Sequence, residues 1–594
     1  MRKPADPSES LPPVAAEYIR AVVGKIGYTR RVRREVFQEL VDHFTDALRS
    51  CGDERERAER ARGLVEEFGD PKMLARMIRR GKKRCRPLWK KAIVRFWQAI
   101  GCTIAAMILY VLWQFTGQPT ISVDYLARFN RFARPDIREE DNAWPYLERA
   151  MALYVPIDPN NKSRDGDLME KVSRYFYLYT PADEFTDGER SAVDKWARRN
   201  EPAWQEFLAA GRKPYCWHEL KTADGSTQMI SVLAPSLHSL RQLARAGIWR
   251  AETEARQGKL HQAVEDSLAV IRVGDRLNYA VLVEGLVGIS MKSTGHNCLR
   301  NLLSDYRFSS VQLAALQHQL EEIGEGGDFW MAMEAERLGS LDVVQRVFTE
   351  GGLGGGHIIP QRLVAFSMDT GSSLVERPAI LALGVLHVGR DETVRFINDY
   401  FDRAKGETRL TPWQRKQEPE TSEQFILRAQ SRGLLYQARY AFPLMFLPDL
   451  ATATDLNCQA KASHRATVAS IALLRWRKDK GQFPQRLDEL VGGGYLSSLP
   501  ADPYSDGPLK YRRTEGGFIL YSIGENFKDD GGDPNAPGAH MGYRTPLDIV
   551  YWPPPKPRKV APETRPQPEE CCEKEHERLA HGATAARIRQ RGVA

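Results

Sequence analysis

The side chains that could carry chemistry are scattered along the chain and form no known catalytic motif. The sequence contains no HExxH zinc-protease motif, no GxSxG nucleophile turn, no phosphate-binding loop and no CxxC pair. His218-Glu219 follows Cys216 closely enough to suggest a metal cluster, and Asp42-His43 suggests an acid–base pair. Separate packing and surface roles are the favoured interpretations, including a solvated helix face for the second pair. The sequence therefore predicts a non-enzymatic protein.

The chain has too few cysteines for disulfides to hold its fold together. Eight cysteines among 594 residues exclude a scaffold built on disulfides. Besides the adjacent pair Cys571-Cys572 in the tail, three of them, Cys216, Cys298 and Cys458, fall in the region that the topology below places outside the cytoplasm. An odd number permits at most one disulfide among the three, and its pairing stays open.

Length and composition indicate an ordinary globular chain of several domains. The 594 residues suffice for about three to five domains. Charged residues make up 27% of the chain and hydrophobic residues 42%. The positive charge is concentrated, because residues 1–95 hold 24 Lys and Arg against 14 Asp and Glu. Such a basic segment suits either nucleic acid or a membrane surface.

Residues 96–115 form the segment that suits a membrane span. These 20 residues, FWQAIGCTIAAMILYVLWQF, contain no formal charge. At about 1.5 Å per residue, a helix of this length crosses the roughly 30 Å hydrocarbon core of a bilayer. Trp97 and Trp113 lie near its ends, where amphipathic rings favour the interface. We therefore expect a transmembrane helix over residues 92–116, the alternative being a buried core helix.

The charges beside this segment predict its orientation. Residues 76–95 hold ten basic side chains, and residues 116–135 hold three. Positively charged flanks stay in the cytoplasm, so we expect an uncleaved signal anchor with its N-terminus inside. Residues after about 120 then lie outside the cytoplasm, in a single-pass protein of a bacterial inner membrane. The lipid bilayer explains the basic segment without a nucleic-acid partner.

Residues 1–90 are expected to form a small cytoplasmic helical bundle. Apolar residues recur at helical spacing in residues 33–49 and 54–68, and Gly69-Asp70-Pro71 ends the second helix. The order ELVDHFTDAL, then RAERARGLVEEFGDPKMLARMI, resembles the HAAS-type or permease-prefix domain that precedes membrane spans in bacterial proteins. This resemblance implies a regulatory or interaction role.

Residues 120–450 are rich in helix formers and are expected to form an exported α-helical domain. Residues 239–277 have the pattern of a helical hairpin that turns at Gly258. The hairpin loosely resembles a tetratricopeptide unit, but no repeat at a fixed period supports a solenoid. The glycine-rich run at 351–356 follows helical sequence, which favours a connector over a phosphate-binding loop.

Residues 455–552 combine one long helix with short strands. A helix is predicted at 455–480, a hairpin at 509–523 and a last strand at 548–552. The order GQFPxxLxEL, LPxDPY, hairpin and YSIGxxxxDDGG resembles the globular domain of the major, G-type pseudopilin of type II secretion, which implies a small α+β module. Because this module follows a separate anchor instead of its own leader and apolar helix, we do not expect pilus assembly. Residues 553–594 are expected to be a disordered tail.

The pseudopilin resemblance also implies a calcium site in the loop at residues 524–538. In that family the last loop binds calcium and fixes the C-terminal strand. The matching carboxylates here are Asp529, Asp530, Asp533 and Asp548. Calcium takes about six to eight hard oxygen ligands, which a glycine-rich acidic loop can supply. The alternative is a solvated acidic turn without metal.

The combined pattern favours a mainly α-helical, single-pass envelope protein. The expected order is a cytoplasmic helical bundle, a transmembrane helix, an exported helical domain and the α+β module. The favoured function is non-catalytic binding or scaffolding among envelope or secretion proteins. Two alternatives stay open, namely an exported hydrolase whose site is assembled from distant residues and a sensor that signals to residues 1–90.

Overall fold

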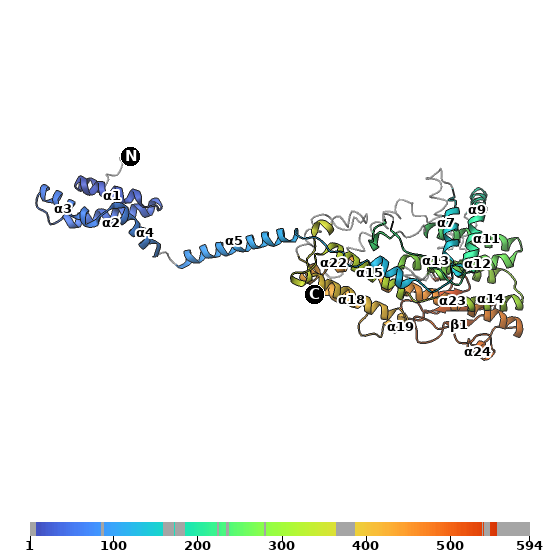
Figure 1. Cartoon of the computed structure of the whole chain (residues 1–594). Helices are drawn as coiled ribbons and strands as arrows, with labels where there is room; N and C mark the ends of the chain where they lie inside the picture. The colour runs from blue at the N-terminus through green and yellow to red at the C-terminus, as the bar shows by residue number, and fades with distance from the viewer. Residues whose placement is uncertain are drawn as a thin grey trace. The chain divides into compact units, whose positions relative to one another are not determined.

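Helices make up most of the described residues, which include three short strands between residues 510 and 552 (Figure 1). The computed structural model describes residues 7–84, 88–157, 171–172, 185–222, 225–232, 237–277, 281–363, 386–536, 539 and 547–554. The chain forms two compact units, residues 1–113 and 114–594. The mainly helical fold predicted from the sequence is confirmed, whereas the predicted tail from residue 555 onward lies outside the described residues.

Four helices build the core of the first unit. The Asp53 carboxylate caps the third helix by accepting a hydrogen bond from the Arg55 N–H, and Gly69 ends it with a φ of 72°. Phe44 is fully buried and stacks on Phe68, with 5.5 Å between ring centroids. The buried core residues all lie between residues 11 and 75, so the first unit has a core of its own. After a short 3₁₀ turn at Pro7–Ser10, the helices are α1 (Pro13–Lys25), α2 (Arg30–Leu48), α3 (Glu54–Phe68) and α4 (Pro71–Arg84).

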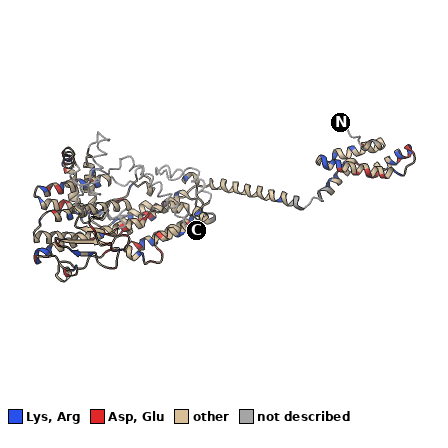
Figure 2. Cartoon of the chain, turned by 180° about the vertical axis from the view of Figure 1, so that it is seen from behind, with Lys and Arg blue, Asp and Glu red and all other residues tan. Residues whose placement is uncertain are grey.

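α5 (Leu88–Gln114) differs in kind from these four helices. Its segment Ala92–Gln114 is long and apolar enough to cross a membrane, and no part of its most apolar window is buried by protein. A core helix of similar composition would be mostly buried. Figure 2 shows the helix free of acidic residues, with its few basic residues toward the N-terminal end. It is the one helix among the described residues that meets these criteria.

Long antiparallel helices form the body of the second unit. α11 (Leu237–Arg256) and α12 (Leu260–Arg276) make the predicted hairpin, which turns at Gly258 with a φ of 82°. α13 (Leu282–Asp305) approaches α12 so closely that a Cβ at Gly274 would lie 2.6 Å from the Gly288 carbonyl oxygen. The other helices are α6 (Tyr125–Ala133), α7 (Trp144–Leu153), α9 (Asp187–Arg199), α10 (Glu201–Gly211), α14 (Ser310–Ile323), α15 (Trp330–Val347), α18 (Arg390–Glu407), α19 (Pro412–Arg415), α20 (Ser422–Ser431), α21 (Leu434–Arg439), α22 (Ala441–Phe446) and α24 (Glu489–Gly492).

α23 (Leu450–Lys480) and a small sheet complete the second unit. The helix begins earlier than the predicted start at residue 455, and it ends at Lys480 as predicted, where Gly481 adopts a left-handed φ of 76°. Antiparallel pairing in the order β1-β2-β3 confirms the predicted hairpin and last strand. The strands are β1 (Lys510–Arg513), β2 (Phe518–Ser522) and β3 (Ile549–Trp552).

One hydrophobic core joins the helical region to the α+β region. It runs from Ala143, just before α7, to Trp552 in β3. α23 lies inside this core, because small side chains such as Ala466 let α13 and α14 pack closely against it. The regions predicted as domains at 120–450 and 455–552 therefore share their core.

The separate core of the first unit predicts that fragment 1–84 folds alone. Phe44→Ala in this fragment should reduce the free energy of unfolding by about 3–5 kcal/mol, because it leaves a cavity in the core. Val14 is exposed, so Val14→Ala should change the same quantity by less than about 0.5 kcal/mol. Urea unfolding followed by circular dichroism measures both values. A random-coil spectrum for the unsubstituted fragment would contradict the prediction.

Candidate functional site

The acidic loop brings three of the four predicted calcium ligands near one another. Asp548 directly precedes β3 and is 2% exposed. Its Oδ2 accepts a hydrogen bond of 2.7 Å from the Gly532 N–H. Burial raises the pKa of Asp548 above its ordinary value, and the nearby charges of Asp529 and Asp530 raise it further. These three carboxylates therefore repel one another while all are ionised.

Two of these carboxylates also accept hydrogen bonds that hold the loop in shape. The Tyr521 hydroxyl donates to Asp529 at 2.8 Å, and burial raises the pKa of Tyr521, so this hydroxyl keeps its proton. The Asn526 side-chain amide donates to Asp530 at 2.7 Å. These side-chain contacts help to hold the loop in shape, while Asp529 and Asp530 themselves are exposed to solvent.

The fit of this loop to calcium is partial. Oδ1 of Asp548 is buried and has no hydrogen-bond partner among the described residues, which is the kind of oxygen that a cation would satisfy. Asp533 accepts a hydrogen bond of 2.9 Å from the Asn535 N–H in its own turn, and its charge is not among those that shift the pKa of Asp548. Within the described ranges, no three Asp, Glu, His or Cys side chains converge as metal ligands. Calcium binding therefore stays a prediction.

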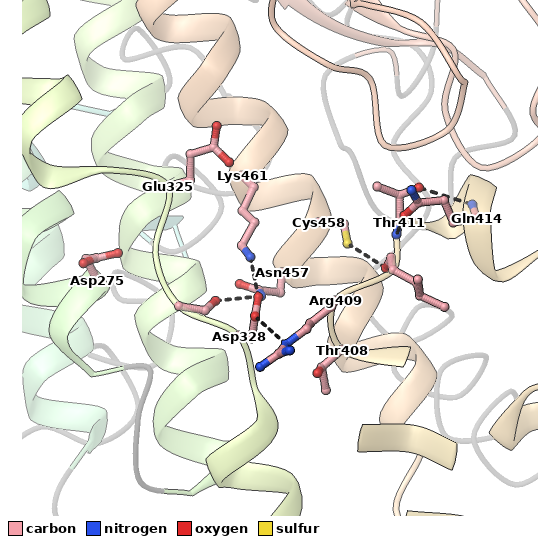
Figure 3. A network of polar contacts seen from close by, with 12 residues as sticks. Asp275, Glu325, Asp328, Thr408, Arg409, Thr411, Gln414, Asn457, Cys458 and Lys461 are labelled. Atoms are coloured by element: carbon pink, nitrogen blue, oxygen red, sulfur yellow. Dashed lines mark hydrogen bonds and ion pairs between the residues drawn. The ribbon is translucent and has the colours of Figure 1, made fainter. Parts of the chain in front are cut away.

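A network of charged side chains joins α23 to the loop at 324–329, between α14 and α15 (Figure 3). Lys461 of α23 contacts Asp328, with 2.8 Å between Nζ and Oδ1. Asn457, one turn earlier, donates a hydrogen bond of 3.2 Å to the Gly327 carbonyl. Arg409 approaches Asp328 at 3.8 Å. These contacts hold the loop along the polar side of α23.

A buried ion pair lies next to the same loop. Lys292 of α13 and Asp275 of α12 are 2.9 Å apart, and each side chain is 2% exposed. Lys292 also donates to the Glu325 carbonyl at 2.8 Å, while the Glu325 side chain pairs with Arg465 through contacts of 2.6 and 2.5 Å. Gly326 has a φ of 94°, and a Cβ there would lie 2.4 Å from the Lys292 ammonium. Only glycine fits this close approach.

Burial and charge set the protonation states of Cys458 and Glu325 in this region. Burial raises the pKa of the Cys458 thiol, so the thiol stays protonated and unreactive. Burial also raises the pKa of Glu325, but the hydrogen bonds and charge of Arg465 outweigh it, and the net shift is downward. The network is thus able to fix the packing of α23, since each buried charge faces an opposite one.

Two histidines meet beside this network. His296 of α13 and His464 of α23 pack edge to face, with 5.2 Å between ring centroids. Burial lowers the pKa of both, to about 4 for His464, so both rings are neutral at neutral pH. Neither nitrogen of His296 has a hydrogen-bond partner among the described residues. Two imidazoles alone are too few ligands for a structural metal site.

A buried carboxylate of the core, that of Asp266, has a raised pKa. Trp204 donates a hydrogen bond of 3.2 Å to Asp266 of α12, and Arg250 approaches Asp266 at 3.0 Å. Burial raises the pKa of Asp266 to about 7, against the effect of Arg250 and with a further rise from Glu254. Strongly shifted carboxylates often mark active sites. Asp266, however, lies in the core among α10, α11 and α12 and does not line the groove described next.

An open groove lies between the C-terminal end of α23 and the β1–β2 hairpin. Its volume is about 790 Å³. Trp552 stacks on Phe518 at one side, with 5.1 Å between ring centroids. The groove is lined by three cations and five aromatic rings, namely Arg307, Arg477, Lys478, Tyr306, Phe308, Phe483, Phe518 and Trp552.

The side chains that line this groove carry positive charge only. Its lining contains no Asp or Glu. Arg477 and Lys478 come from the last turn of α23, and Arg307 comes from the connection between α13 and α14. The three cations are exposed, and none forms an ion pair with a described residue. Sequence reasoning missed the groove, because its three parts are far apart along the chain.

The other predicted ligands do not form a site. Cys216, Cys298 and Cys458 are free thiols, so no disulfide joins them. His218 contacts Glu284 of α13 at 2.9 Å and stacks on Trp144, with 3.7 Å between ring centroids. A packing role thus accounts for His218.

Comparison with known proteins adds no family to this geometry. No family model, no curated protein and no solved structure matches the chain. The HAAS-type and pseudopilin resemblances are therefore predictions from sequence motifs.

The unpartnered oxygen of Asp548 predicts opposite effects of Asp548→Asn with and without calcium. In EDTA at pH 7, D548N should raise the melting temperature of the full-length protein in detergent, because it removes a buried, repelled charge. Folding raises the pKa of Asp548, so the contribution of Asp548 to the stability of the folded protein is most favourable at low pH and is lost as the pH rises. The rise in melting temperature caused by D548N should therefore shrink as the pH is lowered toward the ordinary Asp pKa of about 4.

With calcium, the unsubstituted protein should melt higher than in EDTA. Binding to the folded form stabilises it by about 2.7 kcal/mol at a hundredfold excess over Kd. D548N should lose this response, whereas Asp506→Asn, at an exposed position outside the loop, should keep it. Identical melting of the unsubstituted protein in calcium and EDTA would mean that the loop binds no calcium.

Proposed function

We propose that this chain is a single-pass bacterial envelope protein whose exported unit binds an acidic segment of another envelope or secretion protein without catalysing a reaction. α5 crosses the inner membrane with its N-terminus in the cytoplasm, in keeping with the ten-to-three excess of basic residues before the span. The observation that carries the binding role is the groove at the end of α23, where unpaired cations lie beside aromatic rings.

The composition of the groove matches an extended acidic peptide. Guanidinium groups such as those of Arg307 and Arg477 bind carboxylates through two parallel hydrogen bonds. Arg477 lies over the Phe483 ring at 5.0 Å, which holds the guanidinium in position. Of the five rings that line the groove, Tyr306 is half-buried and the other four are buried, so Tyr306 offers the most aromatic surface to side chains that alternate with the carboxylates. A volume of about 790 Å³ falls within the usual range of ligand sites.

The alternatives receive less support from the described residues. A hydrolase would require titratable groups with shifted pKa values at the wall of a cavity. Asp266 and His464 have such shifts, but both are buried and neither lines the groove. A sensor would use the same anchor and would further require a partner for residues 1–90.

A labelled peptide that alternates Glu and Phe tests the binding function. Fluorescence anisotropy with the full-length protein in detergent should give a measurable Kd. The triple variant R307E/R477E/K478E should raise this Kd at least about tenfold, or about 1.4 kcal/mol. The rise is expected because the variant turns attraction into repulsion.

A matched variant separates the groove from net charge. K195E/R198E/R199E reverses three exposed cations of α9, which lie outside the groove, and should leave the Kd within about twofold of the original value. A peptide that alternates Lys and Phe should not bind. Equal weakening by both triple variants, or no weakening by the groove variant, would contradict the proposed function.

A further inference from the structure

The outer face of α4, which we define as Met73, Arg76, Met77 and Arg80, is open to solvent in the first unit. Met73 is 65% exposed and Met77 is 58% exposed. Spacings of three and four residues place these side chains on one side of the helix. Ala75, on the opposite side, is buried in the core. Two large apolar side chains thus lie among cations on a surface that the described protein does not cover.

Two tyrosines fix the direction in which the outer face of α4 points. The Tyr18 hydroxyl donates a hydrogen bond of 2.8 Å to the Gly69 carbonyl, just before the helix. The Tyr28 hydroxyl donates one of 3.2 Å to the Arg79 carbonyl, near its other end. Both ends of α4 are therefore tied to the core. The helix cannot turn its methionines inward without breaking these bonds.

The charge around α4 has one sign. Residues 71–95 contain eleven Lys and Arg and no Asp or Glu. Lys72, Arg76, Arg79 and Arg80 form no ion pair with a described residue. Most basic residues elsewhere in the first unit are interspersed with acidic ones, as in Arg31 and Glu35 of α2, which contact at 3.3 Å. An unbalanced run of this length attracts a polyanionic surface.

We infer that the outer face of α4 rests on anionic phospholipid headgroups, with Met73 and Met77 inserted below the level of the phosphates and Arg76 and Arg80 paired with them. The inference rests on the proposed function in one respect, namely that α5 enters the same bilayer. Residues 85–91 separate α4 from the apolar segment and reach at most about 25 Å. Basic amphipathic helices bind membranes through this combination of cations and apolar side chains.

The exposed methionines favour lipid over nucleic acid. Both ligands present phosphates, and both would be attracted by Arg76 and Arg80. A nucleic-acid backbone, however, offers no apolar layer for Met73 and Met77, whereas the interfacial region of a bilayer does. Removal of the methionines should therefore weaken binding to vesicles more than binding to DNA.

Flotation with vesicles tests the inference on fragment 1–84, which carries its own core and lacks α5. Circular dichroism first establishes that each variant is folded. The fragment should float with vesicles of phosphatidylcholine and phosphatidylglycerol and should not float with pure phosphatidylcholine. Each charge near the surface changes partitioning about fivefold, so R76E/R80E should lower it by more than about twentyfivefold. M73S/M77S should weaken vesicle binding and leave binding to a DNA duplex unchanged.

A matched charge reversal completes the test. R30E/R34E reverses two exposed arginines of α2 that are four residues apart, as Arg76 and Arg80 are. It changes the net charge of the fragment by the same amount as R76E/R80E does. Its partitioning onto anionic vesicles should fall much less than that of R76E/R80E. Equal partitioning onto neutral and anionic vesicles would overturn the inference, as would equal effects of the two reversals or tighter binding to DNA than to vesicles at the same salt concentration. Failure here would leave the anchoring role of α5 untouched, because the fragment does not contain α5.

Discussion

The exposed apolar surface of α5 is the constraint on which the organisation of the protein depends. The most apolar part of Ala92–Gln114 presents a surface that no described part of the chain buries. Apolar surface in water costs about 25 cal/mol per Å², and a helix of this length matches the thickness of a bilayer. The helical bundle at residues 11–75 and the second unit each bury a core of their own. A bilayer around α5 would cover this apolar surface.

Within the second unit, α23 connects the helices to the sheet. Its small side chains enter the shared core, while Lys461 and Arg465 neutralise Asp328 and Glu325. Buried or half-buried ion pairs add little net stability, but they penalise any arrangement in which a charge loses its partner. The network thus fixes α23 in one position along the loop at 324–329. The last turn of α23 lies beyond the network, which leaves Arg477 free to line the groove.

Local signals explain how much of this fold could be predicted from the sequence. α3 was predicted with its observed bounds, because Asp53 caps its start and Gly69 ends it. α23 begins before its predicted start, since Asp449 caps it by accepting a hydrogen bond from the Thr452 N–H. Long-range features were not predictable. The pair Lys292–Asp275, the two packed histidines and the groove depend on helices that meet only in the folded chain. The approach of the loop to Asp548 likewise depends on strand pairing.

The orientation of α5 is tested most directly by reporter fusions in bacteria. Alkaline phosphatase, which is active only outside the cytoplasm, should be active when fused after residue 140. A green fluorescent protein that folds only in the cytoplasm, fused to the N-terminus, should be fluorescent in the same strain. An inactive phosphatase at residue 140, at normal expression, would show that the second unit stays in the cytoplasm and would contradict the single-span account.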